Sequence, residues 1–310
     1  MASRPAAQAV PAEQLDRQFR EEALALGADL IGVAPVARFS PGFDDARVFG
    51  YAPTGFAPED LLPGTRSVVV LAVRQLTGVV ESTVADAETT YAWGNFGYVH
   101  LNRLMNDMTY RLARWLEARG WSALPLGGAL ASRRSTAAQD GDLCAPLYGV
   151  FSVKRAAVLA GLGRRARNGL VTTPQFGVKV RLAVLLTEAP LQPDAVLDGS
   201  PCPPKCTICV DVCPTAAITR EGRVDHARCF SDCGRRGKTL AEARRIMEEQ
   251  YTADDPDADY LPGDHSGIDS FGNRRCRVAC MAFCPLGERP TPHLVRQLKA
   301  WRTSHPRITL

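Results

Sequence analysis

Nine of the ten cysteines in this 310-residue chain lie between Cys202 and Cys284, in two closely spaced runs and the stretch that connects them. Each run ends in the dipeptide Cys-Pro. The first run contains Cys202, Cys206, Cys209 and Cys213, and the second contains Cys276, Cys280 and Cys284. Closely spaced thiolates ahead of a final Cys-Pro are typical ligands of iron–sulfur clusters. The sequence therefore predicts a redox centre.

The spacing also predicts which cysteines act together. Bacterial two-cluster ferredoxins bind each 4Fe–4S cluster with one run, and the last cysteine of each run binds the other cluster. Applied here, this crossing assigns to one cluster, cluster I, the residues Cys202, Cys206, Cys209 and Cys284. It assigns to the second, cluster II, only Cys213, Cys276 and Cys280. The fourth ligand of cluster II must come from the connecting stretch, which offers Cys229 and Cys233.

Both runs depart from the usual Cys-x2-Cys opening by one residue. In the first, the extra residue falls within Pro203-Pro204-Lys205. Two prolines favour a tight turn, so we expect this turn to loop the extra residue out. The gap from Cys276 to Cys280 is longer by one residue as well, and there the sequence offers no comparable device.

Zinc and disulfides are the alternative uses of these cysteines. The Cys206-x2-Cys209 pair would suit a structural zinc site, but the Cys-x3-Cys-Pro endings would not, and no histidine stands at ligand spacing beside them. Disulfides are usual in small secreted domains. Residues Met1 to Pro11 lack the apolar core of a signal sequence, so we expect a cytoplasmic location that keeps thiols reduced.

Charge and hydropathy limit the expected partners. The formal net charge is only +4, and the basic residues are scattered rather than gathered in a block. We therefore expect nucleic acid to be an unlikely partner. No apolar stretch is long enough to cross a bilayer, so we expect no membrane partner.

Apolar periodicity predicts alternating helices and strands before the cysteines. Helices are expected at 12–27, 98–119 and 153–162, and strands at 29–34, 68–73 and 180–186. This order indicates an α/β or α+β domain over residues 12–195. A cluster domain would follow at 196–290, and the extension at 291–310 is expected to return to the first domain.

The order of motifs resembles the epoxyqueuosine reductase family, which includes the cobalamin and electron-transfer portion of reductive dehalogenases. The resemblance covers roughly residues 25–290. Its matching segments are 59–67 before an apolar strand, 91–94 leading to Tyr98 and His100, the Gly-Leu-Gly turn at 161–163, Asn168, and 173–177. Both cysteine runs then follow in the same order.

The resemblance implies a fold and a set of binding residues. It implies an α+β chain with a nitroreductase-like cobalamin-binding domain, followed by a bacterial ferredoxin-like domain with two 4Fe–4S clusters. It implies a corrinoid site formed by Tyr98, Gly161, Gly163, Arg167, Asn168, Phe176 and Gly177. In the family an Arg-Cys pair after the first run completes cluster II, which favours Cys229 over Cys233.

The proton donor departs from the family pattern. The family's catalytic carboxylate precedes the Gly-Leu-Gly turn, but residues 145–152 contain no carboxylate. Tyr148 is the nearest donor there, and reductive dehalogenases use a tyrosine; the same side chain could equally be a core aromatic with a satisfied hydroxyl. His100, expected at a helix start, is the second candidate because its ordinary pKa suits proton transfer, although such a position also suits a cap or a surface group.

We therefore expect an oxidoreductase that passes electrons through two 4Fe–4S clusters to a corrinoid. The reaction would remove a hydroxyl or halide from a small organic substrate, with an external electron donor such as ferredoxin or flavodoxin. The alternatives are a cobalamin-reducing, cobalamin-processing or electron-transfer protein without its own substrate turnover, and a flavin-dependent reductase. A nitroreductase-like fold permits each of them.

Overall fold

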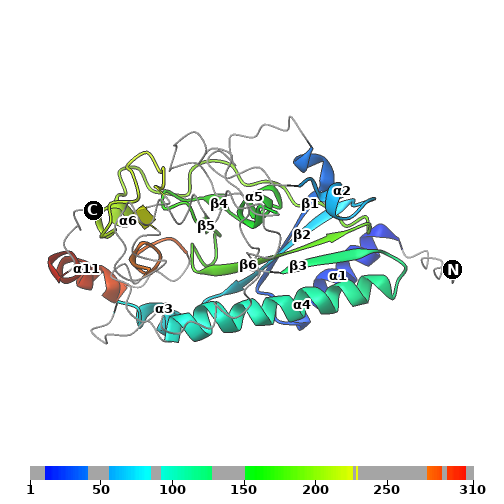
Figure 1. Cartoon of the computed structure of the whole chain (residues 1–310), viewed down its shortest axis with the longest axis horizontal. Coiled ribbons are helices and arrows are strands. Elements are labelled where there is room, and N and C mark those ends of the chain that lie inside the picture. Colours follow the sequence, from blue (N-terminus) through cyan, green and yellow to red (C-terminus); the bar gives the residue numbers. More distant parts are fainter. Residues whose placement is uncertain are drawn as a thin grey trace, which may run out of the picture.

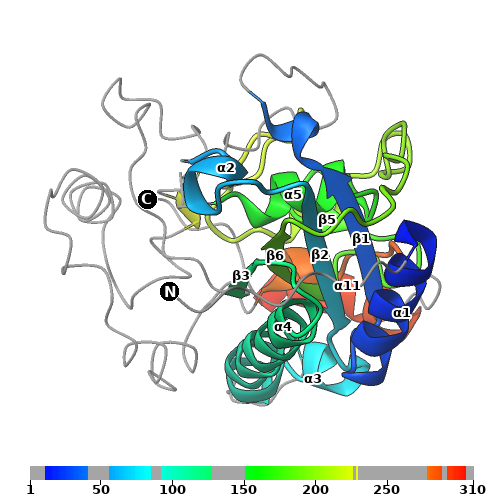
Figure 2. The ribbon, with the colours of Figure 1, turned by 90° about the vertical axis from the view of Figure 1, so that its right-hand side faces the viewer.

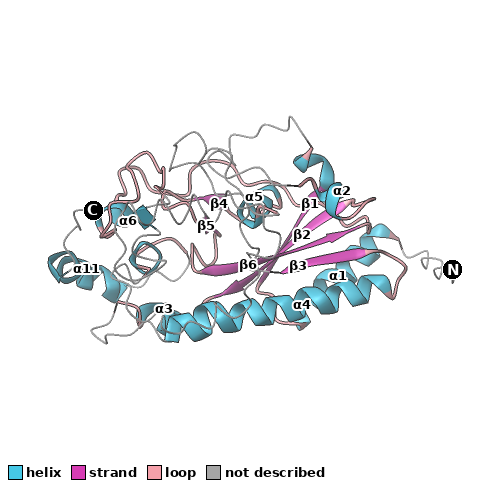
Figure 3. Cartoon of the chain, in the orientation of Figure 1, coloured by secondary structure: helices cyan, strands magenta, loops and turns pink. Residues whose placement is uncertain are grey.

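The computed structural model of the chain describes residues 11–40, 56–84, 92–127, 151–225, 228–229, 278–287 and 292–304. Its strands are β1 (Leu30–Pro35), β2 (Ser67–Arg74), β3 (Ala123–Gly127), β4 (Arg164–Arg165), β5 (Val171–Thr172) and β6 (Val180–Thr187). Its helices are α1 (Ala12–Ala25), α2 (Pro58–Leu61), α3 (Thr77–Glu81), α4 (His100–Glu117), α5 (Val153–Leu159), α6 (Ile208–Asp211), α10 (Ala279–Ala282) and α11 (Pro292–Ser304). A 3-10 turn, η1 (Val36–Phe39), and a π-helical turn, η3 (Trp93–Val99), complete the elements (Figure 3).

Four strands form an antiparallel sheet in the order β1-β2-β6-β3. Strands β2 and β6 are its centre, and they pair in register from Ser67 opposite Thr187 to Arg74 opposite Val180. A separate short hairpin joins β4 to β5. The mixed α and β content agrees with the predicted class, and the antiparallel pairing decides for α+β over α/β.

Helices cover both faces of the sheet. Alternate residues of β2 point to opposite faces, so Val69 and Leu71 pack with α1 and α4, whereas Val68 and Val70 pack with α5. Figures 1 and 2 show α4 along one side of the sheet and α5 on the other. Helix α4 contributes the apolar stripe that the sequence predicts, with Leu101, Met105, Met108, Leu112 and Leu116 buried.

One expectation for the helices needs correction. The helix expected to start at Tyr98 instead begins with η3, whose Trp93 indole donates a hydrogen bond of 3.0 Å to the Gln75 side-chain oxygen.

The extension was expected to return to the first domain, and α11 contacts both predicted domains. Trp301 packs in one apolar cluster with Val80 and Val178 of the first domain. Beside the cysteine runs, its ring lies 5.6 Å from that of Phe283, and Arg302 pairs with Asp211 at 2.8 Å.

A third apolar cluster joins the predicted domains. It unites Val80, Trp93 and Val178, which precede residue 196, with Val212 and Cys284 from the cysteine runs. The boundary at residue 196 therefore crosses a shared core. Among the described helices, none is long and apolar enough to cross a membrane.

Candidate metal centre

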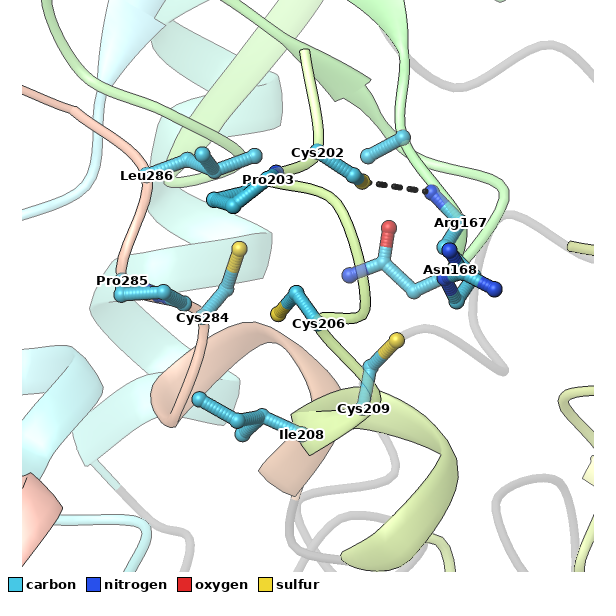
Figure 4. Close-up of a pocket in the computed structure, with 11 residues that line it drawn as sticks. Arg167, Asn168, Cys202, Pro203, Cys206, Ile208, Cys209, Cys284, Pro285 and Leu286 are labelled. Atoms are coloured by element: carbon cyan, nitrogen blue, oxygen red, sulfur yellow. Dashed lines mark hydrogen bonds between the residues drawn. The ribbon is translucent and has the colours of Figure 1, made fainter. Parts of the chain in front are cut away.

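Four cysteines from distant parts of the chain line one pocket (Figure 4). Cys202, Cys206 and Cys209 come from the segment after β6, and Cys284 follows α10. The pocket encloses about 310 Å³ of empty space, part of it open to solvent. Its other walls are formed by Ala166, Arg167, Asn168, Pro203, Ile208, Pro285 and Leu286. The structure thus brings together the four residues assigned to cluster I.

The pocket suits a group larger than a single ion. Among the residues that the structure describes, no three His, Cys, Asp or Glu side chains converge closely enough to hold one metal ion. The four cysteines are nevertheless neighbours around one space. Sulfur atoms spread around a cavity fit a cluster of several iron atoms, whereas a structural zinc needs four donors about 2.3 Å from a single point.

Strained backbone supports the cysteine loops. Lys205, Ala216 and Val278 are the non-glycine residues with positive φ among those described, at 66°, 51° and 49°. Each lies within three residues of a cysteine. The first two sit in turns: the Cys206 amide donates to the Pro203 carbonyl at 3.1 Å, and the Ala216 amide to that of Cys213 at 3.2 Å. Strain of this kind tends to gather at functional sites.

The two longer gaps between cysteines are now explained. The turn expected at Pro203-Pro204-Lys205 is present, and Lys205 adopts the left-handed conformation there. In the second run, Val278 occupies the left-handed region directly before α10. A β-branched residue rarely adopts this conformation, so the extra residue between Cys276 and Cys280 falls beside a sharp local turn that sequence spacing alone did not reveal.

Burial opposes ionisation of the pocket thiols. The pKa of Cys209 is raised to about 12, first by burial and then by the nearby Cys284, Cys202 and Cys206, while Arg167 acts in the opposite direction. The pKa of Cys284 is raised to about 11, again mainly by burial. Metal ligation requires thiolates. A strongly positive group in the pocket would favour the loss of these two protons.

Donors from the backbone reach the sulfur atoms. The Arg167 amide donates to Cys202 Sγ at 3.3 Å (Figure 4), and the Ala217 amide donates to Cys213 Sγ at 3.3 Å. Hydrogen bonds to ligand sulfurs are among the factors that tune iron–sulfur potentials. They stabilise the charged thiolate.

The residues assigned to cluster II are described in part. Cys213, Cys229 and Cys280 belong to the described residues, whereas Cys276 and Cys233 lie outside them, and so does Cys144. The charges of Cys229 and Cys280 both act on the Lys154 ammonium, whose pKa is nevertheless lowered because surrounding protein desolvates it. This shared neighbour places Cys229 and Cys280 in one region.

Lys154 was not singled out from the sequence. Lys154 lies in α5 and part of its side chain is exposed, while nearby protein desolvates its ammonium group. Its Nζ donates to the Gly169 carbonyl at 3.2 Å, and the side-chain Nδ2 of the adjacent Asn168 donates to the Cys280 carbonyl at 3.0 Å. The turn at 168–169 therefore connects this lysine to the second cysteine run.

Three glycines expected to bind a cofactor have packing roles in the chain itself. A Cβ at Gly161 would overlap the Ala195 carbonyl, one at Gly163 the Thr172 carbonyl, and one at Gly177 the Leu286 carbonyl. These close approaches explain the glycines without any bound group. Their role toward a cofactor stays a prediction.

The remaining predicted binding residues lie in two places. Arg167 and Asn168 line the cysteine pocket, and the Phe176 amide donates to Thr173 Oγ1 at 3.0 Å in a neighbouring turn. Tyr98 lies apart from them on η3, where its ring centroid is 4.2 Å from the guanidinium carbon of Arg181. Arg181 also donates to the Asn102 side-chain oxygen.

Of the two predicted proton donors, His100 belongs to the described residues. Tyr148 lies outside the described residues. His100 begins α4 as an exposed residue, and its ring centroid lies 6.3 Å from that of Phe96 in an edge-on contact. His100 is thus accessible to a partner but belongs to no described pocket.

Buried basic residues near the cysteines are what sequence reasoning missed. Lys179 is only 8% exposed, and the charges of Cys284 and Glu81 act on it. Lys179 and Arg181 alternate with apolar residues at the start of β6. Basic residues that interrupt an otherwise apolar strand could have indicated buried positive charge near the site.

No family model matches the chain, but curated proteins do. It is 28% identical over 255 residues to the epoxyqueuosine reductase of Staphylococcus aureus, which covers 77% of the chain and 60% of that protein. It is 30% identical over 239 residues to that of a Synechococcus strain, covering 72% and 66%. With the Bacillus subtilis enzyme the identity is 39% over 150 residues, covering 47% and 32%. The chain thus spans from about a third to two thirds of these relatives.

Solved structures share the fold. An epoxyqueuosine reductase bound to an epoxyqueuosine-modified tRNA stem loop superposes with a TM-score of 0.51, covering 86% of this chain and 81% of that one at 18% identity. A reductive dehalogenase, for which a mechanism of B12-dependent dehalogenation is suggested, gives a TM-score of 0.52, covering 94% of this chain and 42% of that one at 16% identity. Identities this low show a common fold and nothing finer.

The tRNA complex overturns one expectation. We expected a small-molecule substrate and an unlikely role for nucleic acid, but a protein of this fold and of the relatives' name binds an RNA stem loop. The expectation rested on the lack of a basic block in the sequence. Scattered basic residues can gather in a folded chain, so that argument was too weak. The sequence matches and the shared fold confirm the resemblance of this chain to the epoxyqueuosine reductase and reductive dehalogenase family.

Proposed function

We propose that the chain is an iron–sulfur oxidoreductase that reduces a modified nucleoside within a tRNA stem loop, with epoxyqueuosine as the first substrate to test. One observation carries the redox part: Cys284 lines one pocket with three cysteines that lie 75 to 82 positions earlier in the sequence. The tRNA part follows from the names of the sequence relatives and from the stem-loop complex of the shared fold.

The residues present fit two 4Fe–4S clusters. Cluster I would be held by Cys202, Cys206, Cys209 and Cys284, and iron would replace the protons of these thiols. Burial, and then the neighbouring cysteines, raise the pKa values of Cys209 and Cys284 in the absence of iron. Cluster II would be held by Cys213, Cys229, Cys276 and Cys280. Cys229 is preferred over Cys233 because Arg228-Cys229 matches the Arg-Cys pair that follows the first run in the family.

A corrinoid is the proposed electron acceptor, as in the family that the chain resembles. When bound, it would supply a reducible metal centre for breaking a carbon–oxygen bond. Tyr98, Arg167, Asn168 and Phe176 are the proposed contacts, together with backbone amides near Gly161, Gly163 and Gly177. Backbone carbonyls of the chain fill the space beside these glycines. We therefore propose that the glycines contact the corrinoid through their backbone N–H groups and do not leave room for it.

Side chains of the protein would supply the protons of the reaction. Reduction of an epoxide-like carbon–oxygen bond consumes two electrons and two protons, and the clusters deliver electrons one at a time from an external donor such as ferredoxin or flavodoxin. Tyr148 is the proposed donor of a proton to the leaving oxygen. His100 is the second candidate, and its exposure on α4 suits a contact with a large substrate.

Iron analysis is the first test. Anaerobically reconstituted protein should hold about eight irons per chain, and Cys206→Ser or Cys284→Ser should each remove about half. Cys144→Ser is the matched control, since Cys144 belongs to neither run, and it should keep all the iron. Comparing Cys229→Ser with Cys233→Ser decides the fourth ligand of cluster II. Full iron in Cys206→Ser and Cys284→Ser would refute the ligand assignment.

Turnover is tested separately. Reduced protein with added cobalamin is incubated with an epoxyqueuosine-containing tRNA stem loop, and the nucleosides are identified by mass spectrometry. Conversion that fails in Tyr148→Phe but survives in His100→Gln would assign the acid. Bound cobalt with eight irons and no conversion would instead favour a cobalamin-handling or electron-transfer protein. The absorbance of flavin in place of corrinoid would favour a flavin-dependent reductase.

A further inference from the structure

A buried lysine and a half-buried glutamate lie beside one wall of the four-cysteine pocket. Lys179 is 8% exposed, and a lysine is rarely buried so deeply without a partner. The positions of three neighbours show where it lies. Val178 packs in one apolar cluster with Cys284, and so does Val80, the residue before Glu81. Lys179, Glu81 and Cys284 are thus each part of, or adjacent to, the same small core.

Two backbone contacts fix this arrangement. The Gln75 amide donates to the Lys179 carbonyl at 2.8 Å, which extends the pairing of β2 and β6 by one residue. Two residues before Lys179, Gly177 approaches the Leu286 backbone so closely that no Cβ would fit. Leu286 follows Cys284 by two residues. Lys179 is therefore held on a rigid strand end against the segment that carries Cys284.

The electrostatic interactions are reciprocal. The charges of Cys284 and Glu81 both favour the protonated form of Lys179, although burial is the larger effect and lowers its pKa overall. Lys179 in turn opposes the rise in the pKa of Cys284. One carboxylate oxygen of Glu81 is buried. The pair thus consists of a cation beside a proposed ligand and an anion beside that cation.

We propose that Lys179 and Glu81 act in opposite directions on the reduction potential of cluster I. This inference rests on the proposed function, since it presupposes a cluster in the pocket. Reduction adds negative charge to the cluster, and a fixed positive charge stabilises the reduced form. Local charge is one of the factors that set these potentials. Lys179 should therefore raise the potential, and Glu81 should moderate that effect.

Potentiometric titration of the reconstituted protein, followed by electron paramagnetic resonance, tests this. The midpoint potential of cluster I is identified by its loss in Cys206→Ser. Unit charges about 10 Å apart at an effective dielectric near 20 change an equilibrium constant about tenfold. Lys179→Met should thus make cluster I harder to reduce by about tenfold, which is 59 mV for a one-electron couple. Glu81→Gln should shift the same potential the other way by a smaller amount.

Lys205→Met is the matched control. Lys205 precedes Cys206 in the pocket, but it is exposed. Water and salt screen an exposed charge, so the same substitution there should move the potential much less. Shifts of opposite sign in Lys179→Met and Glu81→Gln support the proposal. Structural damage would not produce that pattern.

Two results would overturn the proposal. One is a shift of the same sign in both variants, and the other is a shift no larger than that of Lys205→Met. If Lys179→Met loses the cluster, Glu81→Gln decides: a higher potential supports the pair, and an unchanged one refutes it. Wild-type protein without iron would refute the proposed function instead, so the two failures are distinguishable.

Discussion

Replacing Gly177 with alanine should remove cluster I without touching a cysteine. Gly177 has a φ of +58°, and a Cβ there would overlap the Leu286 carbonyl oxygen and lie 2.5 Å from its carbonyl carbon. Both obstacles are backbone atoms, so no side-chain rotation relieves them. Because Leu286 follows Cys284 by two residues, we expect the cysteine to be displaced from the pocket.

The expected loss of stability follows from two contributions. The left-handed conformation costs an alanine about 1–2 kcal/mol, and overfilling a packed contact costs about 1–3 kcal/mol. The free energy of unfolding should fall by about 2–5 kcal/mol, a large part of the stability of a typical domain. Denaturant unfolding of the iron-free protein measures this, and iron analysis after reconstitution measures the fate of the cluster.

Gly27→Ala is the control that separates strain from collision. Gly27 also has a positive φ, +106°, but a Cβ there would meet nothing within 4 Å. Gly27→Ala should therefore lose stability and keep its iron, whereas Gly177→Ala should lose both. Full iron content in Gly177→Ala would refute the argument that this turn positions Cys284.

Two further predictions concern the fold. Asp194→Ala should destabilise the protein by about 1–3 kcal/mol in urea unfolding, because Asp194 accepts from the Val33 amide at 2.8 Å and pairs with Arg20 at 3.0 Å; an unchanged midpoint would contradict this. The iron-free fold should also lose stability in alkali. The pKa values of Cys209 and Cys284 are raised from 9.0 to about 12 and about 11, so the unfolded chain releases these protons first. Their contribution to stability is complete below pH 9.0 and falls as the pH rises toward those values, which thermal unfolding at increasing pH will detect or exclude.

Local patterns predicted the elements that depend on local rules. The apolar run of β2 and the stripe on α4 follow from simple periodicities, and both are present with bounds close to those expected. The proximity of Cys284 to Cys202 was also predictable, because the ferredoxin pattern pairs the last cysteine of each run with the other run. Patterns of residue type were sufficient wherever chemistry or periodicity restricts the choice.

Features that depend on tertiary contact were not predictable. Gly161, Gly163 and Gly177 suggested a cofactor cradle, but backbone carbonyls from distant segments occupy the space beside them. The docking of α11 beside the cysteine runs involves Trp301, whose partner Phe283 lies in the second cysteine run, and the spacing of the cysteines does not reveal this contact. The expectation against nucleic acid was wrong because scattered charge in a sequence says little about the surface that folding produces.

The proposed clusters would stabilise a cysteine region that has unfavourable features without them. Its loops hold Lys205, Ala216 and Val278 in conformations that such residues avoid, at about 1–3 kcal/mol each. Burial raises the pKa values of two of its thiols, Cys209 and Cys284, and so opposes their ionisation. Neither feature would favour this arrangement in a metal-free protein, whereas iron–thiolate bonds offset both. Strain and raised thiol pKa values are therefore independent signs of one bound group, and they explain why we expect every loss of iron to destabilise this end of the molecule.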